Sequence, residues 1–227
     1  MKKYNWILFD ADGTLFDYEA AEKTALKNSF NKYNLLFNHD VLNLYRSINS
    51  KLWKELEEGK TKPEILQNQR FEILFDKLNI KLSGEEFNSI YLDYLGECTQ
   101  LTEGTFEVLS IISNFYSCAI VTNGLKKVQR TRFENSSIKN FIKEIIISEE
   151  IGYSKPSRDY FEKTFEIIGN PQKSEVLIIG DSITADIKGG IDYGIDTCWF
   201  NPMNKLKNED FHIVYEIKDL NELLNLL

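Results

Sequence analysis

The chain of 227 residues is poor in cysteine and histidine and has no long apolar run. Its three cysteines, Cys98, Cys118 and Cys198, are widely spaced and odd in number, which suits a reducing compartment and offers no zinc site. Neither His39 nor His212 neighbours a Ser, a Cys or an acidic cluster, so a histidine-based triad or a zinc hydrolase is not predicted. Without an apolar segment long enough for a signal peptide or a membrane helix, we expect a cytoplasmic protein.

The composition narrows the possible partners. A net charge of −8 argues against a nucleic-acid polymer, which needs a basic face, and nothing in the sequence predicts membrane binding. The negative charge still permits a small anionic substrate, because a metal ion can reverse the sign of one pocket. Apolar residues at 42% and charged residues at 27% are ordinary for a globular protein, and the length suits one large domain or a core with a modest insert.

The first apolar run ends on two acids. Residues 6–9 (Trp-Ile-Leu-Phe) read as a short strand buried on both faces, as in a parallel sheet. Asp10 and Asp12 follow it, and Gly13 allows a tight turn. Both acids therefore stand at the carboxyl end of a strand, where open α/β sheets bind their ligands. One carboxylate could act as nucleophile or metal ligand and the other as general acid and base, whereas the plainer alternative is an Asp-rich turn.

The predicted secondary structure changes twice along the rest of the chain. Residues 17–97 show helical spacing and no convincing strand, and from residue 117 onward strands and helices alternate, which is typical of a parallel sheet built from βαβ units. The predicted insert helices start at residue 17 or 18, after residue 40, around Thr61–Pro63 and at residue 83. The predicted later strands are 117–122, 144–147, 176–179, 197–200 and 211–214, and the helices between and after them are 126–135, 157–168, 183–193 and 220–227.

A strand as short as the first cannot fold alone, so the α/β part must be discontinuous. We predict a Rossmann-like parallel sheet flanked by helices, formed by residues 1–16 and 97–227. Residues 17–96 are predicted to form an inserted, all-helical domain.

Three further motifs lie at strand ends or helix starts. Thr122 and Asn123 end the second strand, and a hydroxyl there can bind a phosphoryl oxygen, although Thr-Asn-Gly is more often a simple turn. Lys155 is held extended before Pro156 and could screen an anionic substrate, although a lone lysine is usually a solvated surface residue. Asp181 ends a buried strand and Asp186 lies where a helix begins, which suits Mg²⁺. The alternatives are that Asp181 only caps the helix and that Asp186 only favours its N-terminus electrostatically.

In this order, the motifs resemble those of the haloacid dehalogenase (HAD) superfamily, whose members mostly hydrolyse phosphate esters. The resemblance implies that Asp10 is the nucleophile, forming an aspartyl-phosphate, and that Asp12 is the general acid and base. It implies a Mg²⁺ site made by Asp10, the backbone carbonyl of Asp12, Asp181 and Asp186. Phosphate binding falls to Thr122, Asn123 and Lys155, and the insert corresponds to a cap.

Several shorter segments are similar to those of bacterial house-cleaning nucleotidases that act on pyrimidine nucleoside 5′-monophosphates. These include residues 148–152 (Ser-Glu-Glu-Ile-Gly) and 197–201 (Thr-Cys-Trp-Phe-Asn). The likeness implies a nucleoside monophosphate as substrate, and a monomer or weak homodimer is expected. Phe16, Trp53 and Arg70 are the candidates for substrate contact, with packing in the cap as the alternative for the aromatic side chain of Trp53. A sugar-phosphate phosphatase, a phosphomutase, a 2-haloacid dehalogenase and a catalytically silent binding module remain alternatives.

Overall fold

The first strand, β1 (Trp6–Phe9), lies inside a six-stranded sheet of order β3-β2-β1-β4-β5-β6 in which every pair of strands is parallel. The computed structural model describes residues 3–57, 60, 63–206 and 212–227. The other strands of the sheet are β2 (Ser117–Thr122), β3 (Glu144–Ile147), β4 (Val176–Gly180), β5 (Asp196–Phe200) and β6 (Tyr215–Ile217).

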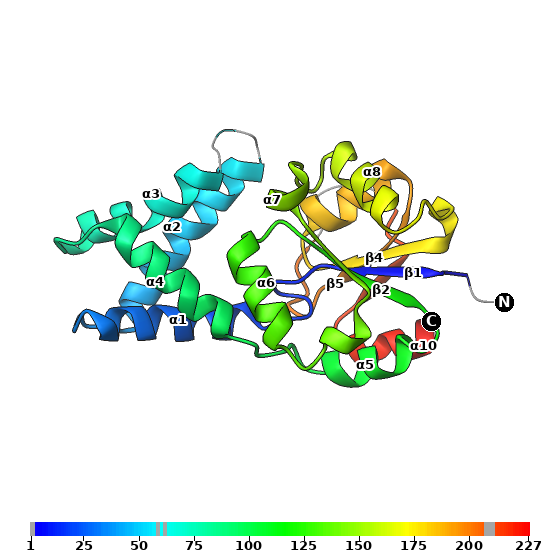
Figure 1. Ribbon diagram of the computed structural model, residues 1–227, viewed down its shortest axis with the longest axis horizontal. Coiled ribbons are helices and arrows are strands. Elements are labelled where there is room, and N and C mark those ends of the chain that lie inside the picture. The colour runs from blue at the N-terminus through cyan, green and yellow to red at the C-terminus, as the bar shows by residue number, and fades with distance from the viewer. Residues whose placement is uncertain (1–2, 58–59, 61–62, 207–211) are drawn as a thin grey trace. The chain divides into compact units, whose positions relative to one another are not determined.

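Helices cover both faces of this sheet, with α8 on one face and α5 and α10 on the other (Figure 1). The helices of this unit are α5 (Thr105–Ile112), α6 (Lys126–Asn135), α7 (Ser148–Ile151), α8 (Arg158–Ile167), α9 (Gly189–Tyr193) and α10 (Leu223–Leu226). Short 3₁₀ turns occupy Lys139–Phe141, Lys173–Glu175 and Leu220–Glu222, and a π-helical turn, η3, spans Ile183–Lys188.

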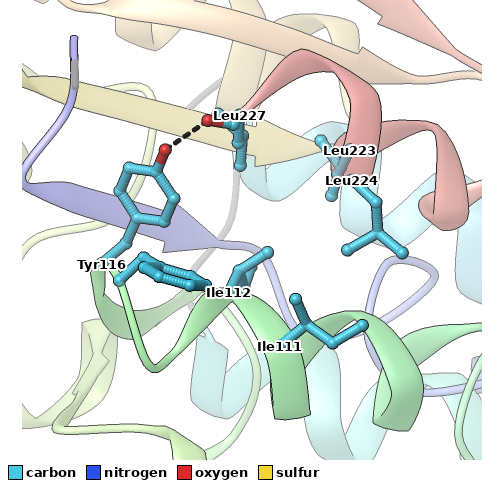
Figure 2. A pocket seen from close by; sticks show the side chains of 7 residues that line it. Ile111, Ile112, Tyr116, Leu223, Leu224 and Leu227 are labelled. Atoms are coloured by element: carbon cyan, nitrogen blue, oxygen red, sulfur yellow. Dashed lines mark hydrogen bonds between the residues drawn. The ribbon is translucent and has the colours of Figure 1, made fainter. Parts of the chain in front are cut away.

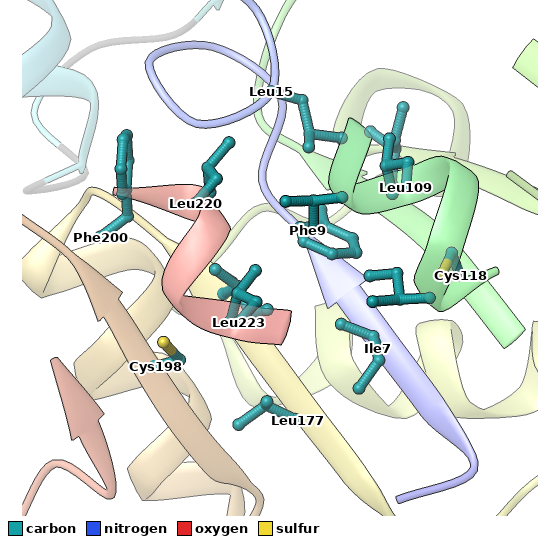
Figure 3. Packing of buried hydrophobic residues seen from close by; sticks show 14 of the residues in the cluster. Ile7, Phe9, Leu15, Leu109, Cys118, Leu177, Cys198, Phe200, Leu220 and Leu223 are labelled. Carbon is teal, nitrogen blue, oxygen red and sulfur yellow. The ribbon is translucent and has the colours of Figure 1, made fainter. Parts of the chain in front are cut away.

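Alternate residues of the strands enter two hydrophobic clusters. Ile7 and Phe9 of β1 point into a cluster that α5 and α10 complete with Leu109 and Leu223, as Figure 3 shows. Leu8 points the other way, into a cluster with the aromatic side chains of α8. Because both faces of β1 are buried, its residues form one continuous apolar run, as the sequence predicted.

A small apolar pocket of about 290 Å³ lies between α5 and α10 (Figure 2). Its one polar side-chain group is the Tyr116 hydroxyl, which donates a hydrogen bond to the backbone carbonyl of Leu227. Tyr116 precedes β2, so this pocket is at the amino end of that strand. The lining residues are Ile111, Ile112, Phe115, Tyr116, Leu223, Leu224 and Leu227.

The chain divides into two units: Met1–Tyr18 with Thr99–Leu227, and Glu19–Cys98. The segments that leave and re-enter the sheet unit are tied together, since the Asp17 N–H donates to the Gln100 carbonyl (3.0 Å) and the Thr102 N–H to the Leu15 carbonyl (3.0 Å). The second unit is built from α1 (Tyr18–Lys32), α2 (His39–Glu57), α3 (Pro63–Leu78) and α4 (Gly84–Glu97). Its interior is aromatic, with Phe71 only 4.8 Å from Phe87 between ring centroids.

The structure confirms the α/β class and the inserted helices, and corrects some element boundaries. The last strand forms over Tyr215–Ile217 and not over 211–214, whose first residue, Phe211, lies outside the described part. The helix predicted over 183–193 begins as the π turn η3. Thr61, a predicted helix start, also lies outside the described residues. Among the described helices, none combines the length and the apolar character needed to span a membrane.

Candidate active site

The predicted acids lie where the direction of strand order reverses. β1 is paired with β2 on one side and with β4 on the other, and the Asp10 N–H donates to the Ile179 carbonyl of β4 (2.9 Å). Asp10 follows β1 directly and Asp181 follows β4 directly, so both carboxylates come to the carboxyl edge of the two central strands. In open α/β sheets this switch point is the place where ligands bind.

Asp186 joins them through the π turn. The N–H groups of both Asp186 (3.0 Å) and Ile187 (3.2 Å) donate to the Ser182 carbonyl, and the Asp186 Oδ2 accepts a hydrogen bond from the Ser182 N–H (3.1 Å). This wide turn directs the Asp186 side chain back toward the end of β4, where it is completely buried. Carboxylate oxygens of Asp10, Asp181 and Asp186 lie within 4.8 Å of one another. Single-turn π segments are frequent at functional sites.

Glycine at position 180 makes room for this arrangement. A Cβ atom built on Gly180 would lie 2.2 Å from Oδ2 of Asp186 and 2.3 Å from its Cγ, so a larger residue would displace the carboxylate. Gly13 has a φ of +85°, which only glycine adopts readily, and a Cβ atom there would meet Asp181 Oδ2 at 3.2 Å. The close approach of the acids therefore depends on two residues without side chains.

Lys155 stands between two of the acids. Its ammonium donates to Asp10 Oδ1 (2.7 Å), Asp186 Oδ1 (2.6 Å) and the Val121 carbonyl (2.7 Å), and the residue is only 2% exposed. All three donor positions of the ammonium are thus used inside the protein. The solvated-surface alternative considered for this lysine is wrong.

Burial and neighbouring charges shift the pKa values of Asp10, Asp181 and Lys155. Burial raises the pKa of Asp10 well above its usual range, with a further contribution from Asp186 and Asp181 that the Lys155 charge opposes. Burial and the Asp186 charge raise the pKa of Asp181 to about 6. For Lys155, burial alone would lower the pKa, but the carboxylates of Asp10 and Asp186 outweigh it and raise the pKa. Ionised forms of Asp10 and Asp181 are thus costly beside a single lysine, and a bound cation would relieve that cost.

The two residues after Val121 have different surroundings. The Thr122 hydroxyl, at the end of β2, accepts from the Gly124 N–H (2.9 Å), which leaves its own O–H able to donate. The Asn123 side chain is joined to the backbone of Lys155: Nδ2 donates to the Lys155 carbonyl and Oδ1 accepts from the Lys155 N–H, both at 2.8 Å. Asn123 thus holds the loop that presents Lys155, whereas the sequence suggested only a contact between Asn123 and phosphate.

Asp12 contacts helix α6. Its Oδ2 accepts a hydrogen bond from Gln129 Nε2 (2.5 Å), and its Oδ1 is ion-paired with Arg132 Nη1. Gln129 and Arg132 are not among the site residues predicted from the sequence. A signal was present, because both are polar residues on the buried stripe of a short helix that directly follows the Thr122 strand.

The three candidate substrate-contact residues differ in their exposure and in their contacts. Phe16 is 1% exposed, and the Cζ atom of Arg132 lies 5.3 Å from the centroid of its ring. Trp53, on α2, is half-buried. Arg70, on α3, is 2% exposed and donates to Asn88 Oδ1 (2.7 Å) and to the Tyr45 hydroxyl (3.3 Å). Of the three, Trp53 has the side chain most open to a ligand.

Comparison with known proteins identifies similar chains over the full length. The family model described as haloacid dehalogenase-like hydrolase matches residues 7–200. HAD-hydrolase YfnB of Bacillus subtilis is 39% identical over 227 residues, which cover all of this chain and 97% of that protein. Pyrimidine 5′-nucleotidases YjjG of Escherichia coli (99% of this chain, 98% of that protein) and PynA of Streptococcus pneumoniae (99% and 95%) are each 33% identical. The crystal structure of YfnB bound to magnesium superposes with a TM-score of 0.95 at 38% identity, covering 100% of this chain and 99% of that one.

Proposed function

The chain belongs to the haloacid dehalogenase-like hydrolases, and from this premise we propose that it hydrolyses phosphomonoesters through an aspartyl-phosphate on Asp10. The observation that carries the proposal is the buried constellation of Asp10, Asp181 and Asp186 around the Lys155 ammonium. A carboxylate that attacks a phosphate needs positive charge beside it, because both reactants are anions.

The first step joins Asp10 to the phosphorus. A carboxylate oxygen of Asp10 forms the new P–O bond while the bond from phosphorus to the ester oxygen breaks. The departing oxygen takes a proton from Asp12. Lys155 screens the charge of the phosphoryl oxygens, and the free O–H of Thr122 is available to donate to one of them.

The second step regenerates the enzyme. Asp12, now ionised, removes a proton from water, whose oxygen attacks the phosphorus and displaces the Asp10 carboxylate. Inorganic phosphate leaves, and Asp12 holds the proton for the next turnover. One acid thus serves as donor in the first step and as acceptor in the second.

The donor set fits Mg²⁺, which prefers oxygen ligands and takes few carboxylates. We propose Asp10, Asp181 and the backbone carbonyl of Asp12 as direct ligands. We propose Asp186 as a further ligand, direct or through water; its two oxygens also accept hydrogen bonds from Lys155 and Ser182. When bound, the cation would neutralise charge on the phosphoryl oxygens.

The proposed substrates are pyrimidine nucleoside 5′-monophosphates. Support comes from the two relatives named pyrimidine 5′-nucleotidases, which match this chain over almost its whole length. The residues at the strand ends recognise only the phosphoryl group, so we assign discrimination among esters to the helical insert, acting as a cap. Interdomain movement was described for the YfnB crystal structure, and a similar movement is proposed here.

The proposed function is tested with a panel of nucleoside monophosphates and sugar phosphates in the presence of Mg²⁺, by measuring released phosphate. We expect the highest kcat/KM with a pyrimidine nucleoside monophosphate. Preference for a sugar phosphate would retain the mechanism and change the substrate class, and an isomerised phosphate ester as product would identify a mutase. Release of halide from a 2-haloacid without phosphatase activity would refute the proposal.

Mg²⁺ binding can be followed by thermal unfolding as well as by activity. At about 100 times its dissociation constant, Mg²⁺ should stabilise the protein by about 2.7 kcal/mol. This should raise Tm by about 5–10 °C for a chain of this size. Asp181→Asn removes a charge from the cluster and should abolish most of this shift, whereas Asp192→Asn, an exposed acid on α9, should not. Excess chelator should stop phosphate release, and full activity in chelator would contradict the metal site.

The insert residues are tested by comparing a nucleotide with a small aryl phosphate. Base stacking on an aromatic ring contributes about 1–3 kcal/mol, so Trp53→Ala should lower kcat/KM for the nucleotide about 10-fold and leave the aryl phosphate unchanged.

Arg70→Met should mainly lower Tm, because the guanidinium is buried and its loss leaves Asn88 and Tyr45 without their donor. A selective loss on the nucleotide at unchanged Tm would instead assign Arg70 to the substrate.

A further inference from the structure

Two side chains of α6 hold the carboxylate of Asp12 from the same side. Gln129 and Arg132 are three positions apart, so they lie on one face of the helix, and each bonds a different oxygen of Asp12. Two N–H donors on two carboxylate oxygens fix both the position of the group and the plane in which it lies. Each oxygen keeps a second lone pair, so the carboxylate can still carry or accept a proton.

The burial of Arg132 makes this contact more than a surface ion pair. Arg132 is 0% exposed, whereas the Asp12 side chain is 26% exposed. The ring of Phe16 lies against the guanidinium at 5.3 Å, which removes water from that side. A buried cation is tolerated only with a counter-charge and hydrogen bonds, so the Asp12 carboxylate is held in place by the cost of separating the pair.

Gly124 makes the second contact possible. A Cβ atom on Gly124 would lie 2.1 Å from Gln129 Nε2 and 3.0 Å from Asp12 Oδ2. The Gln129 amide therefore occupies the space where any other residue at position 124 would place its side chain. The absence of a side chain at Gly124 thus allows the Gln129 amide to reach Asp12.

We propose that Gln129 and Arg132 are positioning residues that orient Asp12 for proton transfer to the leaving oxygen. This rests on the proposed function, in which Asp12 is the general acid and base. Effective proton transfer requires the donor atom within hydrogen-bond reach of the departing oxygen, and a short side chain on a loop meets that condition only when its torsions are fixed. Gln129 and Arg132 should therefore affect the rate most for esters with a poor leaving group, such as the alkoxide of a sugar or nucleoside.

A double-mutant cycle tests the proposal, using Asp12→Asn, Arg132→Met and the variant that combines them. Substrates are a nucleoside monophosphate, which needs a proton on its leaving oxygen, and p-nitrophenyl phosphate, which needs little. Arg132→Met should lower kcat/KM about 30-fold for the nucleotide and less than about 3-fold for the aryl ester. In the Asp12→Asn background the same substitution should add less than about 2-fold, because the group through which it acts is already disabled.

Matched variants separate positioning from general damage. Arg130→Met lies on the same helix and removes a partly exposed ion pair with Glu150, so both substrates should turn over as in the wild type. Arg132→Lys should recover part of the nucleotide activity. Gln129→Met removes one neutral donor without unpairing a buried charge, and should reproduce the nucleotide-selective loss at about 5-fold even if Arg132→Met folds poorly.

Two results would overturn the proposal while leaving the proposed function in place. One is an equal loss on both substrates, and the other is an Arg132→Met effect that is undiminished in the Asp12→Asn background. Wild-type protein that releases no phosphate from either substrate would refute the proposed function, and the positioning role with it.

Discussion

Asp10→Asn is expected to reduce phosphate release by at least about three orders of magnitude, with every phosphomonoester substrate. The amide keeps the shape of the side chain, and its oxygen can still accept the hydrogen bond from Lys155. It is not a nucleophile toward phosphorus, so the first P–O bond cannot form. Because the substitution also removes one of three mutually repelling carboxylates, the fold should be retained.

The measurement has two parts. Steady-state phosphate release is compared between the wild type and the variant, and acid-quenched protein is examined by mass spectrometry for a phosphoryl adduct. The adduct should be present on the wild type and absent from the variant. Asp159→Asn, an exposed acid in the first turn of α8, is the control and should behave as the wild type. Turnover of Asp10→Asn at a tenth of the wild-type rate or more would end the proposed mechanism.

Lys155→Met should cause the second largest loss, because it removes the buried cation between Asp10 and Asp186. Loss of one preorganised charge that stabilises the transition state typically lowers kcat about 10²–10³-fold. The two carboxylates are also left buried without their partner, which should reduce the free energy of unfolding by about 3–5 kcal/mol. Activity and stability should therefore fall together, unlike in Asp10→Asn.

Mg²⁺ provides the diagnostic comparison for this variant. If the Lys155 ammonium and the divalent cation both offset the negative charge of the cluster, Mg²⁺ should raise the Tm of Lys155→Met more than that of the wild type. Lys163→Met, an exposed lysine paired with Glu166 on α8, should change neither Tm nor activity measurably. An active, fully stable Lys155→Met protein would remove this residue from the proposed site.

Local patterns were sufficient for most of the fold. The strand at Trp6–Phe9 and the helix at Lys126–Asn135 occur where the apolar run and the helical spacing predicted them. The last strand was placed four residues too early, because the short segments near residues 211–217 carry similar apolar signals and only pairing with β5 selects Tyr215–Ile217. Likewise, helical spacing at 183–193 could not reveal the π turn, whose extra residue is set by how Asp186 reaches the end of β4.

For the site, the order of the motifs along the sequence was enough to predict acids at the ends of the strands. The rule that parallel strands end at one edge of a sheet is enough to expect Asp10 and Asp181 near each other. Their roles as nucleophile and metal ligand stay predictions until the variants are measured. The position of Lys155 was also inferred from its place before Pro156, but its burial between two carboxylates was not, because a lone lysine carries no sign of its surroundings.

Local sequence signals were therefore enough to predict most of the elements, their order, and the acids that end the central strands. These depend on interactions between near neighbours: apolar periodicity, turn glycines and helix starts. Which polar side chains meet could not be predicted in this way. The contact of Asp12 with Arg132 joins residues 120 positions apart, that of Asn123 with Lys155 joins residues 32 apart, and Arg70 is enclosed among Tyr45, Asn49 and Asn88 of other helices. Such pairings follow from how strands and helices pack in space, and a buried charge acquires its partner only when packing brings the two together.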